Sequence, residues 1–262
     1  MHRLVTTLLV IALWLPIGAL VPKALRSISV RDGQSVMQVS PISALIADRR
    51  IHKSFSLSLK AALIGGVLTA LYCFAIVSYG RMEQARQQRI FSPGKVLSSS
   101  VGIGVSIPEV ALGLGMLFII NFVGLEGALS RIVMAQSIIS IAAGMGVMLK
   151  GSRQISLRFE SAAYDVGASP IKAAWRVTLP LHGRLMFLSG SLAALLSFED
   201  YVVAYFASPS GANTLPSAIV GLMRGKIEEA YALGAIMVLI ALAIGLALIQ
   251  QSNQPNKRGH QP

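Results

Sequence analysis

The sequence is poor in charged residues, which make up 13% of its 262 residues, while 54% are hydrophobic. Soluble domains carry roughly 25% charged residues, about twice as many. A soluble chain of this length would need a more polar surface than this composition provides. The composition therefore excludes an ordinary cytosolic domain and indicates a membrane protein.

The sequence also lacks the residue clusters that metal, nucleotide and catalytic sites require. Its one cysteine, Cys73, cannot form a disulfide within the chain, and the four histidines are far apart along the sequence. No GxxxxGK[ST] motif is present, so the chain has no P-loop for ATP. Neither a Ser/His/Asp set nor a positioned acid–base pair occurs. We predict that the chain is not an enzyme and binds no metal.

A net charge of +12 is present, but it does not form one basic tract. The 23 Lys and Arg residues fall mostly in short segments between apolar runs. Proteins that bind nucleic acid concentrate basic residues on one face or stripe. This distribution argues against nucleic acid as a partner.

Six apolar runs are long enough to cross a bilayer, which takes about 20 residues of helix. The first follows Arg3 and has features of a signal peptide, but it contains Trp14 and Pro16 and lacks a clear cleavage site. We interpret it as a span and predict an all-α polytopic membrane protein with about six transmembrane helices. The runs are Leu4–Val21, Ala61–Tyr79, Val96–Phe122, Ile132–Leu149, Leu185–Phe206 and Tyr231–Ile249.

The basic residues between the runs indicate the orientation. With both termini in the cytoplasm, the inner segments hold more Lys and Arg than the outer ones, although the loop after the first run is also basic. We divide the chain into a first helix with a periplasmic loop (residues 1–55), a membrane core (56–250) and a disordered cytoplasmic tail (251–262).

One segment of the core, residues 158–181, is polar and rich in turn residues. Its apolar residues recur at i, i+3, i+4 and i+7, which predicts one face of a short helix ending at Gly167. Ser169 is placed to cap a second helix with Pro170 in its first turn, and Pro180 is expected to close it. The apolar face of the first helix consists of Phe159, Ala162, Ala163 and Val166.

This helix–turn–helix segment has two possible roles. It either lies on the lipid surface or docks onto a cytosolic partner. A helix on the lipid surface would need more large apolar residues than this one carries. Two alanines and a capped turn favour docking into a protein cleft.

The segment resembles the EAA loop of binding-protein-dependent ABC importer permeases, whose pattern is E-A-A, three residues, Gly, nine residues, then I-x-L-P. Ala162, Ala163 and Gly167 match, Leu179-Pro180 follow at the family's spacing, and valine replaces isoleucine at 177. Ser161 stands where the family has Glu, and Glu160 precedes it. This shift turns a helical carboxylate by about 100°. The contact with an ATPase is either made by Glu160 after rotation or missing.

From about Ser54 to Ile249 the chain also resembles the second membrane subunit of spermidine/putrescine-type permeases. Ser197–Met223 is similar to the part of those permeases that carries paired acids, a short outer loop and Leu-Pro. The resemblance implies the type I importer permease fold. It also implies ATPase-coupling roles for Glu160, Ser161, Ala162, Ala163, Asp165, Gly167, Pro170, Leu179 and Pro180.

The partners that the resemblance implies are a second permease subunit in a heterodimer, two ATPases and a periplasmic solute-binding protein. The location implied is the bacterial inner membrane. No cofactor is expected in this chain, because ATP and Mg would be bound by the partner ATPase.

Three carboxylates fall inside predicted spans. Glu109 and Glu199 each lie about 20 Å along their helices, and Asp200 follows directly. Charged residues are costly in a bilayer, so these acids are expected to face a water-filled path for a cationic solute or to form hydrogen bonds between spans. A third alternative is an interfacial position, if the edges of the spans are misplaced. Asp200 is the preferred pathway residue. Pro108 is expected to kink the third span.

Polyamines are therefore the favoured substrates, with iron, a phosphonate or an opine as alternatives in the same importer class. A proton-coupled secondary transporter that uses the three carboxylates as a relay is a different class, and it would need no ATPase. No residue set supports a membrane enzyme.

Overall fold

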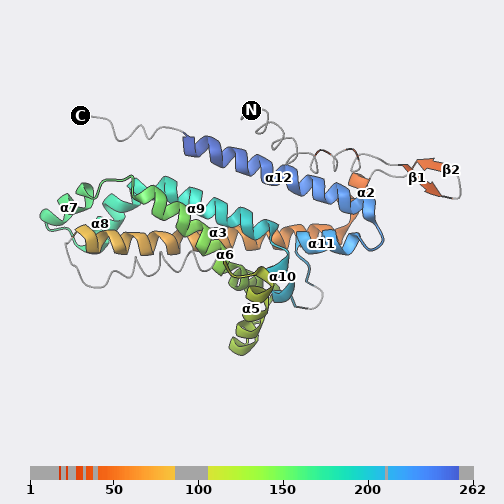
Figure 1. The fold of residues 1–262 in the computed structure, drawn as a ribbon, viewed down its shortest axis with the longest axis horizontal. Coiled ribbons are helices and arrows are strands. Elements are labelled where there is room, and N and C mark those ends of the chain that lie inside the picture. The colour runs from red at the N-terminus through yellow and green to blue at the C-terminus, as the bar shows by residue number, and fades with distance from the viewer. Residues whose placement is uncertain are drawn as a thin grey trace, which may run out of the picture. The chain divides into compact units, whose positions relative to one another are not determined.

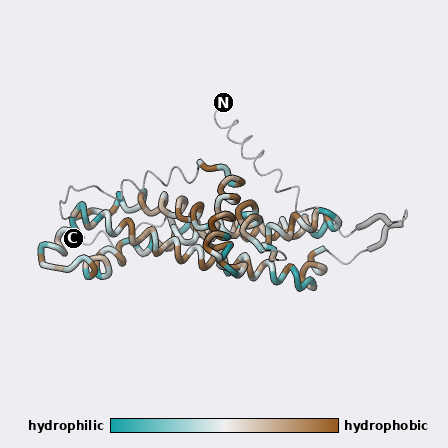
Figure 2. Tube along the Cα trace, turned by 90° about the horizontal axis from the view of Figure 1, so that it is seen from below, coloured by the Kyte–Doolittle hydropathy of each residue, from teal (hydrophilic) through white to brown (hydrophobic). Residues whose placement is uncertain are grey.

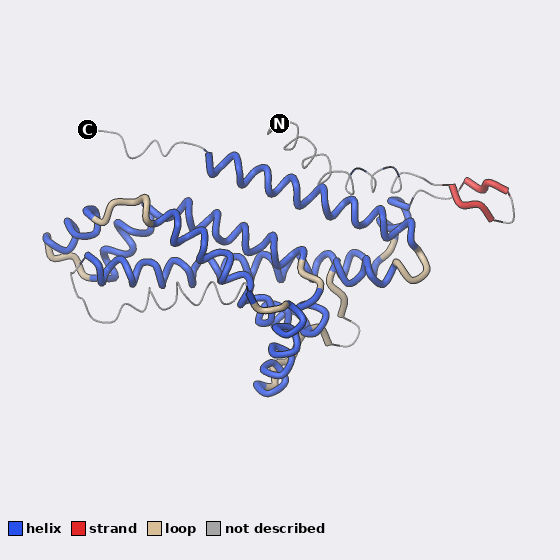
Figure 3. The backbone as a smooth tube through the Cα atoms, in the orientation of Figure 1, coloured by secondary structure: helices blue, strands red, loops and turns tan. Residues whose placement is uncertain are grey.

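The computed structural model describes residues 41–85, 106–209 and 212–253, the backbone of 28–31 and 34–37, and the single residues 18 and 22. Nearly all of these described residues are helical, which confirms the predicted fold class (Figure 3). The first predicted span lies almost entirely outside the described residues, as does most of the predicted tail. Two compact units form, one from residues 1–57 and 213–251 and the other from 58–212 and 252–262.

The first unit contains a β-hairpin that the sequence analysis missed. Strands β1 (Ile28–Arg31) and β2 (Gln34–Met37) pair antiparallel, with the first residue of β1 opposite the last residue of β2. Asp32 and Gly33 lie between them in the sequence. Asp-Gly between short runs with β-branched residues is a strong hairpin signal. The composition of the whole chain concealed this local pattern.

The other described elements of this unit are α2 (Pro41–Ala47), the start of α3 (Arg49–Ala85), α11 (Leu215–Leu222) and α12 (Ile227–Asn253). Helix α12 covers the sixth predicted span and begins four residues earlier. Two glutamates in its first turn favour that start, because they interact well with the positive end of the helix dipole.

Three long helices of the second unit lie side by side: α3, α6 (Ala128–Ser152) and α9 (Leu179–Glu199) (Figure 1). Small residues allow their backbones to approach closely. A Cβ atom at Gly66 of α3 would lie 2.6 Å from the carbonyl oxygen of Gly190 in α9. Such contacts between small residues are typical of helix packing in membranes.

The second unit also contains α5 (Glu109–Val123), which packs against α10 (Val202–Ala207). The predicted kink in the third span is wrong. Pro108 directly precedes α5 in an extended conformation (φ −57°, ψ 131°), so the helix starts after the proline instead of running through it. Residues 96–105 of that predicted span lie outside the described residues, and α5, with 15 residues, is shorter than a usual span.

Four described helices are long and apolar enough to cross a membrane: Arg49–Ala85, Ala128–Ser152, Pro170–Glu199 and Ile227–Gln251. Figure 2 shows that apolar residues predominate along the long helices. The fifth predicted span changes most. Its helix begins well before Leu185 and ends at Glu199, and α10 starts only at Val202.

Candidate functional site

The helix–turn–helix segment consists of two short helices at one end of the group formed by α3, α6 and α9 (Figure 1). Helix α7 (Arg158–Asp165) is followed by a turn and then by α8 (Pro170–Ala173). A π-helical turn, η1 (Ala174–Thr178), joins α8 to α9 without a break. The segment is therefore built onto the start of a candidate membrane span.

The turn between the two helices confirms the predicted local structure. Gly167 has a φ of 79°, in the left-handed region that favours glycine, and its N–H donates to the Tyr164 carbonyl at 2.9 Å. The N–H of Ala168 donates to the Ala163 carbonyl at 2.9 Å, which completes a Schellman motif. The Ser169 hydroxyl accepts a hydrogen bond from the Lys172 N–H at 3.4 Å and caps α8.

Pro180 does not close the second helix, contrary to the prediction. It lies in the first turn of α9, inside a continuous helix from Pro170 to Glu199. Proline removes an N–H donor, and its ring collides with the carbonyl four residues earlier. The wider π-helical turn at Ala174–Thr178 comes just before this point and accommodates the proline without ending the helix.

Large apolar side chains of the segment point away from the rest of the chain. Val166 is 84% exposed, Ile171 71% and Trp175 66%, and Phe159 is also exposed. We call these four side chains the exposed apolar set. A set of exposed large apolar side chains is a candidate surface for contact with another molecule.

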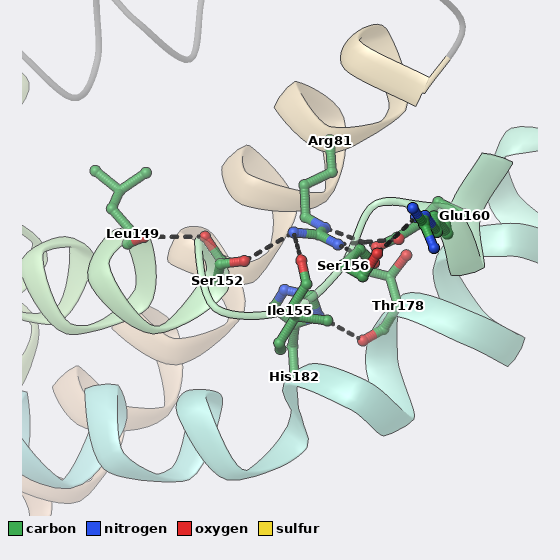
Figure 4. A network of polar contacts seen from close by, with 9 residues as sticks. Arg81, Leu149, Ser152, Ile155, Ser156, Glu160, Thr178 and His182 are labelled. Carbon is green, nitrogen blue, oxygen red and sulfur yellow. Dashed lines mark hydrogen bonds and ion pairs between the residues drawn. The ribbon is translucent and has the colours of Figure 1, made fainter. Parts of the chain in front are cut away.

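A carboxylate of the same segment points inward instead. Glu160 is 1% exposed and forms a two-pronged ion pair with Arg81 near the end of α3 (Figure 4). The Arg81 Nε–H donates to Glu160 Oε1 at 2.6 Å, and the Nη2–H donates to Oε2 at 2.9 Å. This bidentate geometry is the strong form of the arginine–carboxylate interaction.

Arg81 also holds the chain between α6 and α7. Its Nη1 donates to the carbonyls of Ser152 at 2.8 Å and Ile155 at 3.1 Å, and its Nη2 donates to the Ser156 carbonyl at 3.2 Å. With the two bonds to Glu160, five hydrogen bonds match the five N–H groups of the guanidinium. Arg81 thus ties α3, the C-terminus of α6, the connecting loop and α7 together.

His182, in the first turns of α9, lies beside this network (Figure 4). Its side chain is fully buried, and its Nδ1 lies 2.9 Å from the Thr178 carbonyl. The carbonyl can only accept, so Nδ1 carries the hydrogen in this contact. A cavity of about 450 Å³ lies beside Arg81, lined by α3, the end of α6 and the following loop.

The sequence analysis did not identify Arg81, which is one of the basic residues between the apolar runs. Arg81 and Glu160 are 79 positions apart, and no local pattern pairs residues at that separation. The available signal was the displaced glutamate itself. A carboxylate one residue away from its expected position faces another direction and needs a different partner.

Asp200 takes part in a second polar network, at the other end of α9. Its Oδ2 accepts hydrogen bonds from Gln136 Nε2 and from the Ala204 N–H, both at 2.9 Å, and its Oδ1 accepts from the Val203 N–H at 3.2 Å. Gln136 also pairs with Ser197. Asp200 therefore caps α10 and links it to α6, which matches the alternative of hydrogen bonding between helices.

The other two predicted pathway acids are exposed. Glu199 is the last residue of α9, and Glu109 is the first residue of α5, which packs against α10. The structure thus places Glu199 and Asp200 at a break between helices and not inside a continuous span. Their predicted role in a solute pathway stays a prediction.

The chain is similar to proteins of one transport family. Residues 85–258 match the family described as binding-protein-dependent transport system inner membrane component. The putrescine transport system permease protein PotI of Escherichia coli K12 is 27% identical over 214 residues, covering 77% of this chain and 72% of PotI. The putative 2-aminoethylphosphonate transport system permease protein PhnV of Salmonella typhimurium is 31% identical over 200 residues, covering 75% of this chain and 69% of PhnV.

A longer alignment joins the chain to the spermidine/putrescine transport system permease protein PotC homolog of Mycoplasma genitalium. It has 24% identity and covers 92% of this chain and 87% of that protein. Among solved structures, a bacterial ABC transporter involved in the import of the acidic polysaccharide alginate matches with a TM-score of 0.65. That match has 16% identity and covers 97% of this chain and 95% of the other, so it shows a shared fold.

Proposed function

We propose a substrate class and a docking mode for this chain, which belongs to the family of binding-protein-dependent transport system inner membrane components. As a member it is a permease subunit of an ABC importer in a bacterial inner membrane and not an enzyme. Such a permease works in a complex with other subunits. The proposal concerns which solute crosses and how ATP hydrolysis reaches the membrane helices.

The proposed solute is a polyamine. The similarity to PotI and to the PotC homolog supports this class. The break between α9 and α10 supports it chemically, because it presents an exposed carboxylate, Glu199, that would attract a cation. Asp200 already accepts three hydrogen bonds. Glu199 is therefore the acid that we propose meets the solute.

A second candidate solute is 2-aminoethylphosphonate, because PhnV has the higher identity to this chain, 31%. Both candidates carry a primary ammonium group that a carboxylate can bind. Only the phosphonate also carries an anionic group, which an exposed carboxylate would repel. The exposed Glu199 is the feature that favours the polyamine.

Uptake of labelled putrescine, spermidine and 2-aminoethylphosphonate would separate the candidates. The host cells would lack their own importers for these solutes and express this chain with its partner permease, ATPase and binding protein. The Glu199→Gln and Asp200→Asn variants would be compared. We expect polyamine uptake that depends on ATP. Uptake should fall about tenfold or more in Glu199→Gln, because this variant loses one hydrogen bond to a charged group.

One result would count against the polyamine and another against the role of Glu199. Uptake of 2-aminoethylphosphonate alone, by an assembled complex with an active ATPase, would transfer the assignment to the second candidate. Equal polyamine uptake by wild type and Glu199→Gln would remove the carboxylate from the pathway. Weaker uptake in Asp200→Asn alone, with thermal stability unchanged, would return the pathway role to Asp200.

The proposed docking mode places the helix–turn–helix segment in a cleft of a partner ATPase. The exposed apolar set supports this, since it would otherwise stay in contact with water. The complex would contain a second permease subunit, two ATPases that bind ATP and Mg, and a periplasmic solute-binding protein. Both termini of this chain and the segment itself would face the cytoplasm.

Co-purification of the ATPase tests the docking mode. Trp175→Ala removes a large side chain that is 66% exposed, and Phe118→Ala removes one that is 72% exposed on α5, outside the segment. We expect Trp175→Ala to lower the recovery of the ATPase at least tenfold and Phe118→Ala to leave it unchanged. Buried interface tryptophans often contribute 2 kcal/mol or more, which corresponds to more than tenfold.

Gly167→Asp provides a second test, because an aspartate at a φ of 79° strains the turn. We expect this variant to insert into the membrane normally and to lose transport. Normal uptake by Gly167→Asp, or full ATPase recovery with Trp175→Ala, would refute docking through this segment.

A further inference from the structure

We propose that the Arg81–Glu160 ion pair is a strut that transmits movement of the docked segment to α3 and α6. This proposal rests on the proposed docking of the segment to an ATPase. It assigns positioning roles to two residues that do not touch the solute. It also explains why the carboxylate of this loop is displaced by one residue from the family pattern.

The direction of Glu160 supports the strut. Its side chain is 1% exposed and both of its oxygens accept hydrogen bonds from Arg81. A carboxylate held in this way cannot also reach across an interface to a partner. Of the two outcomes left open for the displaced glutamate, a missing contact with the ATPase fits this geometry. In this chain the docking surface is then the exposed apolar set.

The connectivity of Arg81 supports transmission. Its five hydrogen bonds end on the last residue of α6, on the loop after it and on α7, and its own backbone belongs to α3. The positive charge also lies at the C-terminus of α6, where the helix dipole favours a cation. A displacement of α7 therefore moves a group that is bonded to both long helices.

The cost of burying two charges indicates that the pair contributes orientation more than stability. Replacing a buried ion pair by apolar residues of similar volume is often neutral or stabilising. An apolar pair would fill the same space, but it would lack the five directional bonds. An importer that must convert a push on α7 into movement of α3 gains from directional bonds that resist rotation and sliding.

The test compares Glu160→Gln, Arg81→Gln and the double variant Arg81→Met with Glu160→Leu, each in the complete complex reconstituted in vesicles. Three quantities are measured: ATPase recovery, thermal stability of the complex, and the number of solute molecules imported per ATP hydrolysed. The control is Lys226→Gln, which breaks an exposed pair with Glu229 at 3.0 Å. The substrate is whichever labelled solute the wild-type complex imports.

We expect all variants to retain the ATPase, because none of them changes the exposed apolar set. Solute imported per ATP should fall about tenfold or more in both single variants and in the double variant. The double variant should be more stable than Arg81→Gln, because it leaves no buried charge unpaired while the same three carbonyls lose their donors in both. The control should match wild type throughout. Coupling that stays low in the double variant while stability recovers relative to Arg81→Gln is the signature of a strut.

Recovery of both stability and coupling in the double variant would overturn the proposal, because the pair would then only fill space. Unchanged coupling in Glu160→Gln would overturn it too. Failure of the docking proposal looks different: the ATPase would be recovered at wild-type levels with Trp175→Ala.

Discussion

Removing Arg81 should destabilise the chain more than removing Glu160, although the two residues form one ion pair. Arg81→Ala leaves a carboxylate that is 1% exposed without its cation, and three carbonyls lose their donors. Breaking a buried pair in this way costs about 3–5 kcal/mol. Glu160→Ala leaves a guanidinium that still donates to the three carbonyls. Its cost should be about 1–3 kcal/mol, that of leaving part of a polar group unsatisfied.

The chain's single cysteine provides the assay. Cys73 is 0% exposed and packs with Val77, Met145 and Met148 between α3 and α6. Its reaction with a thiol reagent therefore requires the helices to separate. When opening and closing are fast relative to labelling, the labelling rate follows the open population. A loss of about 3 kcal/mol should raise that rate roughly 100-fold.

Arg153→Ala is the matched control, because Arg153 is an exposed arginine directly after α6. It should change the free energy of unfolding by about 0.5 kcal/mol or less. Equal labelling rates in Arg81→Ala and Glu160→Ala would refute the role given to the three carbonyls. The double variant Arg81→Met with Glu160→Leu leaves no unpaired charge. If its Cys73 labelling rate were as high as that of Arg81→Ala, an unpaired charge would not be the cause of the lost stability.

Two further pairs of variants test the packing and the cap. In α6, Gly144→Ala should destabilise the chain by about 1–3 kcal/mol, because its Cβ would lie 2.6 Å from Thr69 Cγ2. A Cβ at Gly146 would meet nothing within 4 Å, so Gly146→Ala should be neutral or stabilise the chain by up to about 1 kcal/mol. Equal rates of Cys73 labelling in the two variants would contradict the close packing at Gly144. At the end of α9, Asp200→Ala should lower the free energy of unfolding by about 1–2 kcal/mol, because α10 loses its cap. Glu199→Ala changes an exposed position and should lower it by about 0.5 kcal/mol or less. Thermal unfolding of the purified chain measures both, and a larger effect at Glu199 would contradict the capping role.

Local patterns identified much of the site in advance. The Gly167 turn, the Ser169 cap and helix α7 have the predicted form, because each depends on residues within a few positions of each other. The β-hairpin had an equally local signal in Asp32-Gly33, which was overlooked in a chain whose composition pointed to helices. Pro180 and Pro108 were misjudged for a different reason. A proline restricts the backbone, but its neighbours decide whether a helix starts, widens or ends there.

The sequence by itself determined that this is a helical membrane protein and that residues 158–181 form a capped helix–turn–helix. Hydrophobic run length and turn chemistry act over short distances along the chain, and they are readable without coordinates. Only the tertiary structure decided where the charged side chains point. Glu160 and Asp200 lie in segments that the sequence marked, but their partners, Arg81 and Gln136, lie 79 and 64 positions away. The packing of α3, α6 and α9 brings these groups together, because buried polar groups must find hydrogen-bond partners wherever the fold supplies them.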